Sequence, residues 1–302
     1  MNPTQQTTST NRQDHHLISP TAKLVAHLRA ETDIPYSKQI DELCEAGKTT
    51  EELFGKREAL VWMSAMLESR YKSLSTLLKR EMLEKGINNV LELACGIQPR
   101  GLLESADPAV TYIETDLPEM ASEKNVLVNE LEPKALERKN YSILPLNILD
   151  GEQLNQVVSK FGEGKIAIIN EGLLPYLSRE EKIIAAENIH KVLSERGGVW
   201  ITPDVSNRER MRKMIEMFPG AGEAMQKIST STGRNMKENS VGDLEDTRKF
   251  YRDLGFNITE YIQGTFVPKI MSLDSITDPE VRDAVMAVLA ESNLWVFEVK
   301  TG

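Results

Sequence analysis

The sequence predicts an α/β fold in which helices cover both faces of a mostly parallel β-sheet. Between residues 90 and 202, short β-rich runs alternate with helical stretches, and this alternation is typical of parallel sheets. The length of 302 residues suits one large α/β domain with additions, or two modest domains. Hydrophobic residues make up 40% of the chain and charged residues 27%, which is an ordinary globular composition.

The composition also excludes several classes of protein. The net charge of −10 argues against a nucleic-acid-binding protein, because such proteins need a basic surface to displace counterions. The two cysteines cannot build a disulfide scaffold or a CxxC zinc module, and they fit a reducing compartment. No apolar run is long enough to span a bilayer, and the N-terminus lacks the apolar core of a signal peptide. We therefore expect a cytoplasmic protein whose partners include neither nucleic acid nor membrane.

The chain is expected to begin with a tail and a helical cap. Residues 1–16 are mostly polar and should be disordered. The pair His15-His16 has no further ligand at metal-binding spacing, so we expect no metal site there. Residues 17–86 should form the cap, whose first helix begins at Ser19-Pro20, where a capping hydroxyl precedes a proline.

Two more helices are predicted in this cap. One should cover residues 37–46 and stop at Gly47. The next should open with the capping box Thr49–Glu52, could break at Gly55, and should end before Gly86. Its apolar side chains recur at spacings of three and four and should form one buried stripe: Leu60, Met63, Leu67, Tyr71, Leu74 and Leu78.

Seven β-rich runs provide the strands of the predicted sheet. They are expected at residues 90–94, 110–115, 141–146, 165–170, 198–202, 256–262 and 294–300. Helices are expected between them at residues 118–131, 152–161 and 178–194. Residues 204–242 do not fit the alternation. We interpret them as an insertion over the carboxyl ends of the strands, where ligands of open α/β sheets bind.

The turn after the first strand carries the strongest local signal. Ala94, Cys95 and Gly96 are small residues that would let a ligand approach the backbone. The turn is not a P-loop, because it lacks Gly-Lys-Ser/Thr, and Pro99-Arg100 stands where a pyrophosphate would need free amides. A tight β–α turn that binds no ligand is the alternative interpretation.

Acidic residues end two further strands. Asp116 follows Gly96 by 20 positions, the distance at which an acid in such a sheet holds the hydroxyl pair of a ribose. Glu114 lies on the same side of its strand and is the alternative candidate. Glu171 comes directly after a buried strand and could hold a cationic group of a ligand, or could belong to a helix N-cap network.

The chain thus contains three motifs in order: Glu92-Leu-Ala-Cys-Gly-Ile-Gln-Pro-Arg-Gly101, Tyr112-Ile-Glu-Thr-Asp-Leu-Pro118 and Glu171-Gly-Leu-Leu-Pro-Tyr-Leu177. Together they resemble the class I S-adenosylmethionine-dependent methyltransferases, and more narrowly the leucine carboxyl methyltransferase and polyketide O-methyltransferase branch. The resemblance runs from about Ser64 to the C-terminus. It implies a Rossmann-like seven-stranded sheet with an antiparallel last strand, within a catalytic domain of residues 87–302. It also implies that the helical cap and a lid insertion at 204–242 enclose the substrate.

The resemblance implies S-adenosylmethionine as the cofactor. The residues expected to bind it are Arg70, Glu92, Ala94, Gly96, Asp116, Leu117, Asn147, Ile148, Asn170, Glu171 and Gly172. In this assignment Glu92 and Gly96 lie against the methionine part, and Asp116 holds the ribose hydroxyls.

The resemblance also implies roles for the other cofactor-binding residues, and the sequence departs from the family pattern at two places. Asn147 and Ile148 match the adenine contact. Glu171 matches a carboxylate near the methionine amino group, and Arg70 resembles the arginine that pairs with the cofactor carboxylate. Ala94 stands where many relatives have a glycine, and Pro99-Arg100 replaces the more usual Asp-x-Arg.

The implied reaction is the attack of an acceptor oxygen on the sulfonium methyl. The acceptor would be a carboxylate or hydroxyl of a small molecule, or a peptide carboxyl group. A carboxylate needs no base at pH 7, whereas a hydroxyl usually does. Tyr176, Asp204 and Glu171 are the base candidates near the crevice, and Tyr176 is the predicted catalytic residue.

The insertion offers substrate contacts as well. Arg208, Arg210 and Arg212 could clamp a substrate carboxylate, although a solvated helix face is the alternative for each of them. Its methionines favour an adaptable apolar lid or ordinary packing. A cofactor-binding scaffold without activity and a nicotinamide-dependent oxidoreductase are the alternative functions, and the Pro99-Arg100 turn disfavours the second. The sequence leaves the oligomeric state open.

Overall fold

The computed structural model of the chain describes residues 19–55, 60–205, 207–218, 220–236, 238–267 and 269–300. The tail predicted for residues 1–16, with its pair His15-His16, lies outside the described residues. None of the described helices is both long and apolar enough to cross a membrane.

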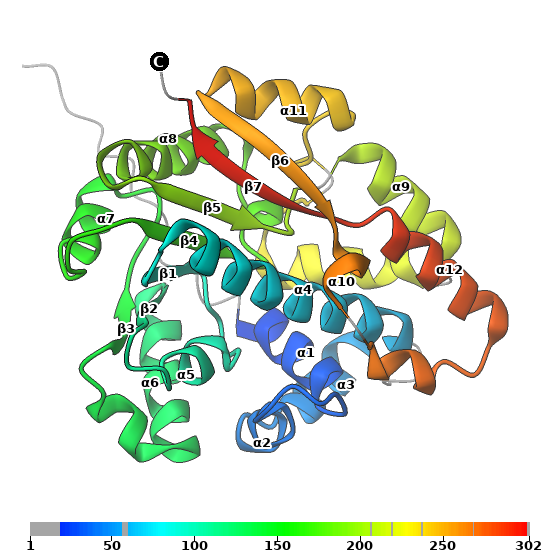
Figure 1. Ribbon diagram of the computed structural model, residues 1–302. Helices are drawn as coiled ribbons and strands as arrows, with labels where there is room; N and C mark the ends of the chain where they lie inside the picture. The colour runs from blue at the N-terminus through cyan, green and yellow to red at the C-terminus, as the bar shows by residue number, and fades with distance from the viewer. Residues whose placement is uncertain are drawn as a thin grey trace, which may run out of the picture.

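The strands of the described chain form one sheet (Figure 1). They are β1 (Asn89–Leu93), β2 (Thr111–Asp116), β3 (Tyr141–Pro145), β4 (Ile166–Asn170), β5 (Gly198–Thr202), β6 (Phe256–Ile262) and β7 (Asn293–Val299). The strand order is β3-β2-β1-β4-β5-β7-β6. Neighbouring strands from β3 to β5 are parallel, and β7 is antiparallel to both β5 and β6. The predicted seven-stranded sheet with an antiparallel last strand is confirmed.

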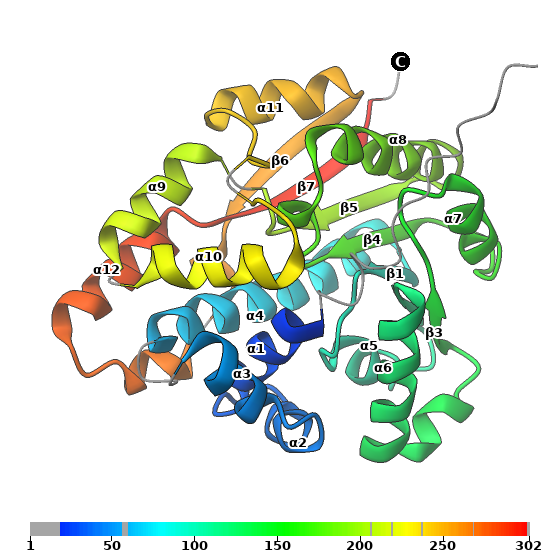
Figure 2. The ribbon, with the colours of Figure 1, turned by 180° about the vertical axis from the view of Figure 1, so that it is seen from behind.

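Helices pack on both faces of this sheet (Figures 1 and 2). One face is covered by α4 (Val61–Lys85), α5 (Arg100–Glu104) and α6 (Pro118–Leu131), and the other by α7 (Gly151–Val158), α8 (Arg179–Arg196) and α11 (Leu244–Asp253). Successive strand residues point to opposite faces. On β4, Ala167 and Ile169 therefore join the core beneath α4, whereas Ile166 and Ile168 join the core beneath α8. Both faces of the sheet are buried for this reason.

The remaining helices lie beyond these two layers. They are α1 (Ser19–Arg29), α2 (Ser37–Leu43), α3 (Ala46–Phe54), α9 (Arg208–Met217), α10 (Ala221–Thr232) and α12 (Pro279–Ala290), with short 3-10 helices at η3 (Pro133–Glu137), η4 (Leu174–Tyr176), η5 (Gln263–Phe266) and η6 (Met271–Ser275). α1 contacts α3, α4 and α10. Leu74, Leu77 and Leu78 of α4 pack against the strands, so this helical segment shares the core of the sheet.

The prediction that Gly47 stops the second helix is wrong. α2 ends earlier, and α3 begins at Ala46 and runs through Gly47 and Thr49, so Thr49 is not an N-cap. The turn between the two helices uses Glu45, which adopts a left-handed conformation with φ 48°. Gly47 instead permits close packing, because a Cβ at this position would lie 3.1 Å from the ring of His27 on α1. The predicted helix end at Gly86 is correct, and this residue has φ 64°.

A glycine in α5 allows this helix to approach β2. A Cβ at Gly101 would collide with the carboxyl group of Glu114, and the backbone N–H of Gly101 donates a hydrogen bond of 3.3 Å to that carboxylate. We expect Gly101→Ala to lower the free energy of unfolding by about 1–3 kcal/mol, because the added methyl overpacks this contact. Urea unfolding measures the change. Gly162→Ala is the matched control, since its Cβ would enter open space, and an equal effect of the two substitutions would contradict the prediction.

Candidate functional site

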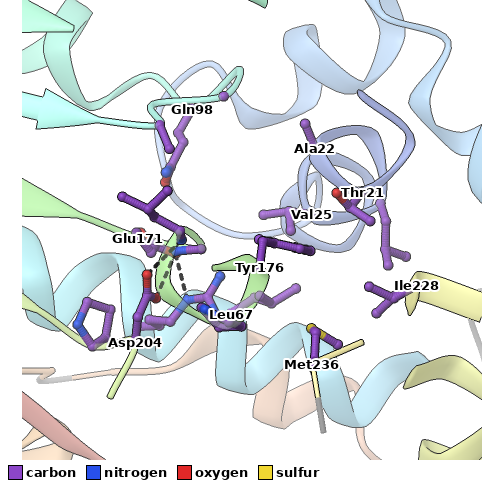
Figure 3. Close-up of a pocket in the computed structure, with 18 of the residues that line it drawn as sticks. Thr21, Ala22, Val25, Leu67, Gln98, Glu171, Tyr176, Asp204, Ile228 and Met236 are labelled. Atoms are coloured by element: carbon purple, nitrogen blue, oxygen red, sulfur yellow. Dashed lines mark hydrogen bonds and ion pairs between the residues drawn. The ribbon is translucent and has the colours of Figure 1, made fainter. Parts of the chain in front are cut away.

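A cavity of about 400 Å³ lies at the carboxyl ends of the parallel strands. Its walls come from the segments that follow β1 to β5, and from α1, α4, α9 and α10. A cavity of this size at this edge of an open α/β sheet is the usual position of a ligand site. Figure 3 shows Tyr176 between a polar group around Glu171 and Asp204 and apolar side chains that include Ile228 and Met236. The cavity therefore has a polar region and an apolar region.

The turn after β1 and the acid at the end of β2 meet in the polar region. The backbone N–H of Gly96 donates a hydrogen bond of 2.8 Å to Oδ2 of Asp116, and the N–H of Leu117 donates one of 2.8 Å to Oδ1. Ala94 and Gly96 both have positive φ, 51° and 52°, and this bend presents the backbone of the turn to the cavity. All four residues line the cavity.

The buried carboxylate of Asp116 is held by backbone donors. Burial raises its pKa, whereas the N–H groups of Gly96 and Leu117 lower it. A carboxylate has about four acceptor positions, so two remain for hydroxyl groups of a ligand. Glu114, the alternative candidate, is fully buried beneath α6, where Lys124 donates to it at 3.0 Å and Tyr141 also donates to it. Glu114 does not line the cavity.

Glu171 binds arginines from three different helices. Its Oε1 accepts hydrogen bonds from Arg29 of α1 and, at 2.8 Å, from Arg70 of α4. Its Oε2 accepts one of 2.6 Å from Arg100 of α5. Burial would raise the pKa of Glu171, but the three positive charges hold it well below its usual range. This carboxylate is therefore fully paired by the protein, and does not face the cavity as a free anion.

The arginine cluster leaves a positive charge beside the cavity. Arg100 also forms an ion pair with Glu92, so the cluster contains three guanidinium groups and two carboxylates. Arg29 and Arg70 line the cavity, whereas Arg100 and Glu92 are fully buried behind them. The net charge of +1 favours an anionic ligand group at this place.

Two of the predicted cofactor contacts lie behind the cavity wall. Glu92 points toward α5, where it accepts hydrogen bonds from Arg100 and, at 2.6 Å, from Tyr112. Asn170 donates to Asp204 at 2.6 Å and accepts from Trp200 at 2.7 Å. Neither residue lines the cavity, so a direct contact of either with the cofactor disagrees with the structure. Both can position residues that do line it.

The other predicted site residues line the cavity. Asn147 and Ile148 follow β3, and Gly172 follows Glu171 with φ 83°. Tyr176 lies in η4 and is half-buried. Burial raises the pKa of Tyr176, while a hydrogen bond with Thr21 and the charge of Arg70 lower it. The net result is a pKa above the usual value, so Tyr176 is a neutral phenol at pH 7.

Asp204 holds the loop that follows β4. Its carboxylate accepts hydrogen bonds from the N–H groups of Gly172, Leu173 and Leu174, at 2.8, 2.7 and 3.2 Å. The side chain of Asn170 donates a further bond of 2.6 Å. Burial raises the pKa of Asp204, whereas Arg70 and the loop N–H groups lower it. Oδ2 accepts three of these hydrogen bonds and Oδ1 one, so the loop and Asn170 take up most of the acceptor capacity of this carboxylate.

Sequence reasoning missed Arg29 and Gln98. Arg29 is 3% exposed and donates a hydrogen bond of 2.9 Å to Oε1 of Gln98, and both residues line the cavity. Arg29 follows Val25 by four residues, so it continues the apolar face of α1. An arginine on the buried face of a cap helix is the signal that could have identified it.

Comparisons with known proteins agree with this geometry. A model of the leucine carboxyl methyltransferase family matches residues 5–190, which is more than half of the chain. The chain belongs to the leucine carboxyl methyltransferase family. Its cofactor is S-adenosylmethionine. No curated protein matches the chain significantly.

Two solved structures show that the fold of this family member is shared over nearly its whole length. A DUF574 family protein from Streptomyces avermitilis has a TM-score of 0.59 and 12% identity, and the alignment covers 94% of this chain and 100% of the other. A putative methyltransferase from Thermobifida fusca has a TM-score of 0.53 and 15% identity, and covers 93% and 94%.

The residues of the cavity fit this cofactor. Asp116 keeps acceptor positions for a hydroxyl pair, and the bend at Ala94 and Gly96 leaves room beside the backbone. The excess positive charge of Arg29 and Arg70 suits the carboxylate of an amino-acid tail.

We expect Glu171→Gln to unfold more easily than the wild type. The substitution leaves buried arginines with too few anions, and breaking a buried ion pair from one side costs about 3–5 kcal/mol. Urea unfolding at neutral pH gives the free energy. Glu187→Gln, at an exposed position of α8, should leave stability unchanged, and a Glu171→Gln variant as stable as this control would contradict the role given to the cluster.

Proposed function

We propose that the protein transfers the methyl group of S-adenosylmethionine to an oxygen of a small organic molecule or peptide, and that this oxygen belongs to a carboxylate. The observation that carries the proposal is that each of the three base candidates at the cavity is protonated or already bound by groups of the protein. Tyr176 is protonated at pH 7, Glu171 is paired with arginines, and Asp204 is occupied by loop N–H groups. An acceptor that is already ionised at neutral pH suits such a site.

The bound cofactor supplies an electrophilic methyl group on a sulfonium. The protein residues supply binding and orientation. In our proposal Asp116 accepts hydrogen bonds from the ribose hydroxyls, and Arg70 and Arg29 attract the carboxylate of the methionine part. The apolar side chains around Ile228 and Met236 exclude water from the acceptor. Tyr176, between the two regions, can donate a hydrogen bond to the acceptor as a neutral phenol.

The direct test measures transfer and identifies the acceptor oxygen. Purified protein is incubated with methyl-labelled S-adenosylmethionine and one of two panels of acceptors. The first panel contains apolar carboxylic acids and peptides that end in leucine. The second contains the matched alcohols and phenols. Alkali releases the label of a methyl ester as methanol, whereas the label of a methyl ether stays bound. We expect alkali-labile label with the acids alone. Stable label would place the reaction on hydroxyl groups, and cofactor binding without transfer to any acceptor would favour the scaffold function.

Removal of the Asp116 carboxylate should weaken cofactor binding. Two hydrogen bonds to a charged acceptor contribute about 3 kcal/mol together, so Asp116→Ala should raise the Kd of S-adenosylhomocysteine about 100-fold in calorimetric titration. Glu119→Ala, three residues further on and exposed, should bind like the wild type. Equal affinities of the two variants would remove Asp116 from the site.

Cofactor binding should also depend on pH through Asp116. The pKa of this carboxyl is raised in the free protein, and binding requires the ionised form, so affinity should be constant above the raised pKa and fall as the pH drops through it. The expected loss is about tenfold per pH unit below that pKa. Titrations with S-adenosylhomocysteine from neutral to acidic pH measure it. Asp116→Asn should bind weakly with no such slope, and a wild-type profile as flat as that of this variant would refute the assignment.

A further inference from the structure

One arginine of the segment over the cavity differs from the other cationic side chains of the wall. Arg210 lies in the first turn of α9 and lines the cavity. Its neighbours Arg208 and Arg212 are exposed, and Arg212 forms an ion pair of 2.7 Å with Glu216 on the same helix. The sequence could not distinguish these three arginines, whereas the structure turns Arg210 alone of them toward the ligand space.

The other arginines of the cavity wall each form an ion pair with a carboxylate of the protein. Arg29 and Arg70 bind Glu171, and Arg234 binds both carboxylate oxygens of Glu181 at 2.9 and 3.1 Å. For Arg210, in contrast, no ion pair is found within the described part of the chain, and its guanidinium donates to the hydroxyl oxygen of Ser292.

The surroundings of Arg210 make its positive charge costly. Burial lowers its pKa, the charge of Arg70 lowers it further, and Glu291 partly offsets both. Glu291 itself is exposed and forms an ion pair of 3.5 Å with Lys213. Arg210 is partly buried, its guanidinium stays protonated in proteins, and the hydroxyl of Ser292 is the partner found for it in the described part of the chain. Such a cation, with N–H donors remaining, fits an anion supplied by a ligand.

The lining near Arg210 is otherwise mainly apolar. Trp62 and Met66 of α4, Met214 of α9 and Leu289 of α12 line the same cavity. The charged groups that act on Arg210 are Arg70, which is paired with Glu171, and the exposed Glu291, which is paired with Lys213. A guanidinium without an ion pair beside these apolar side chains matches an apolar molecule with one negative charge, and its planar fork matches a carboxylate.

We propose that Arg210 is a specificity-determining residue that binds a carboxylate of the methyl acceptor. The acceptor is accordingly an apolar organic acid. This inference rests on the proposed function, because it assumes that the apolar region of the cavity holds the acceptor. Cofactor binding alone implies neither the role of Arg210, nor its contact with the acceptor, nor a preference for acids over neutral molecules.

The test compares matched probes in the presence of saturating S-adenosylhomocysteine. Octanoate and 4-phenylbutyrate are titrated calorimetrically beside their methyl esters and the corresponding alcohols, so that neither catalysis nor a known substrate is needed. We expect the wild type to prefer the acids, and Arg210→Gln to reduce this preference about 10- to 100-fold. Arg210→Lys should retain part of it, because the charge remains but the fork is lost. Arg212→Gln, on the exposed face of α9, should behave like the wild type.

The outcomes separate the two proposals. If S-adenosylhomocysteine binds the wild type and the Arg210→Gln variant equally, and this variant alone loses the preference for acids, the inference is supported. Equal binding of acids and esters by the wild type, or an unchanged preference in Arg210→Gln, overturns it and leaves the proposed methyltransferase function intact. Transfer of methyl groups to no acceptor at all would instead overturn the proposed function. Far-UV circular dichroism verifies that each variant is folded.

Discussion

The carboxylate of Glu171 is the contact on which the cavity depends. It lies directly after β4 and pairs with arginines from α1, α4 and α5, so one buried anion fastens three helices to the sheet. Without this anion, the arginines of α1 and α4 would repel each other at the place where both helices must approach the strand ends. The same pairing leaves the surplus positive charge that faces the ligand space. Glu171 thus contributes both to the packing of the three helices and to the charge that the cavity presents to a ligand.

Three acids at the carboxyl ends of β2, β4 and β5 have different partners. Asp116 is held by two backbone N–H groups and keeps acceptor capacity toward the cavity. Glu171 is paired with three arginines, and Asp204 is held mainly by the loop after β4. The role of each carboxylate therefore depends on the protein groups that already bind it. Its position in a sequence motif does not determine that role alone. This division assigns most of the carboxylate oxygens at the site to binding and positioning.

Much of the fold could be predicted from the sequence, because buried strands and helix ends have local signatures. Every predicted strand is present with ends shifted by at most a residue or so, and Asp116 and Gly96 meet as their spacing indicated. The roles of Glu92 and Arg29 could not be predicted in this way. Glu92 points to the α5 face of β1, and the partners of Arg29 lie 38, 69 and 142 residues away. Such contacts depend on tertiary packing, which one sequence does not encode in any short window.

The contact between α1 and α10 bears on how molecules enter and leave. The two helices meet through a small cluster, in which Leu24 and Leu28 pack near Ala224 and Ile228, and this cluster is separate from both cores of the sheet. Separating α1 from α10 at this cluster exposes few apolar side chains and disturbs no strand. The two helices can therefore move apart at a small fraction of the free energy of global unfolding. Separation of α1 and α10 is therefore a low-cost way to admit ligands to the cavity and release them.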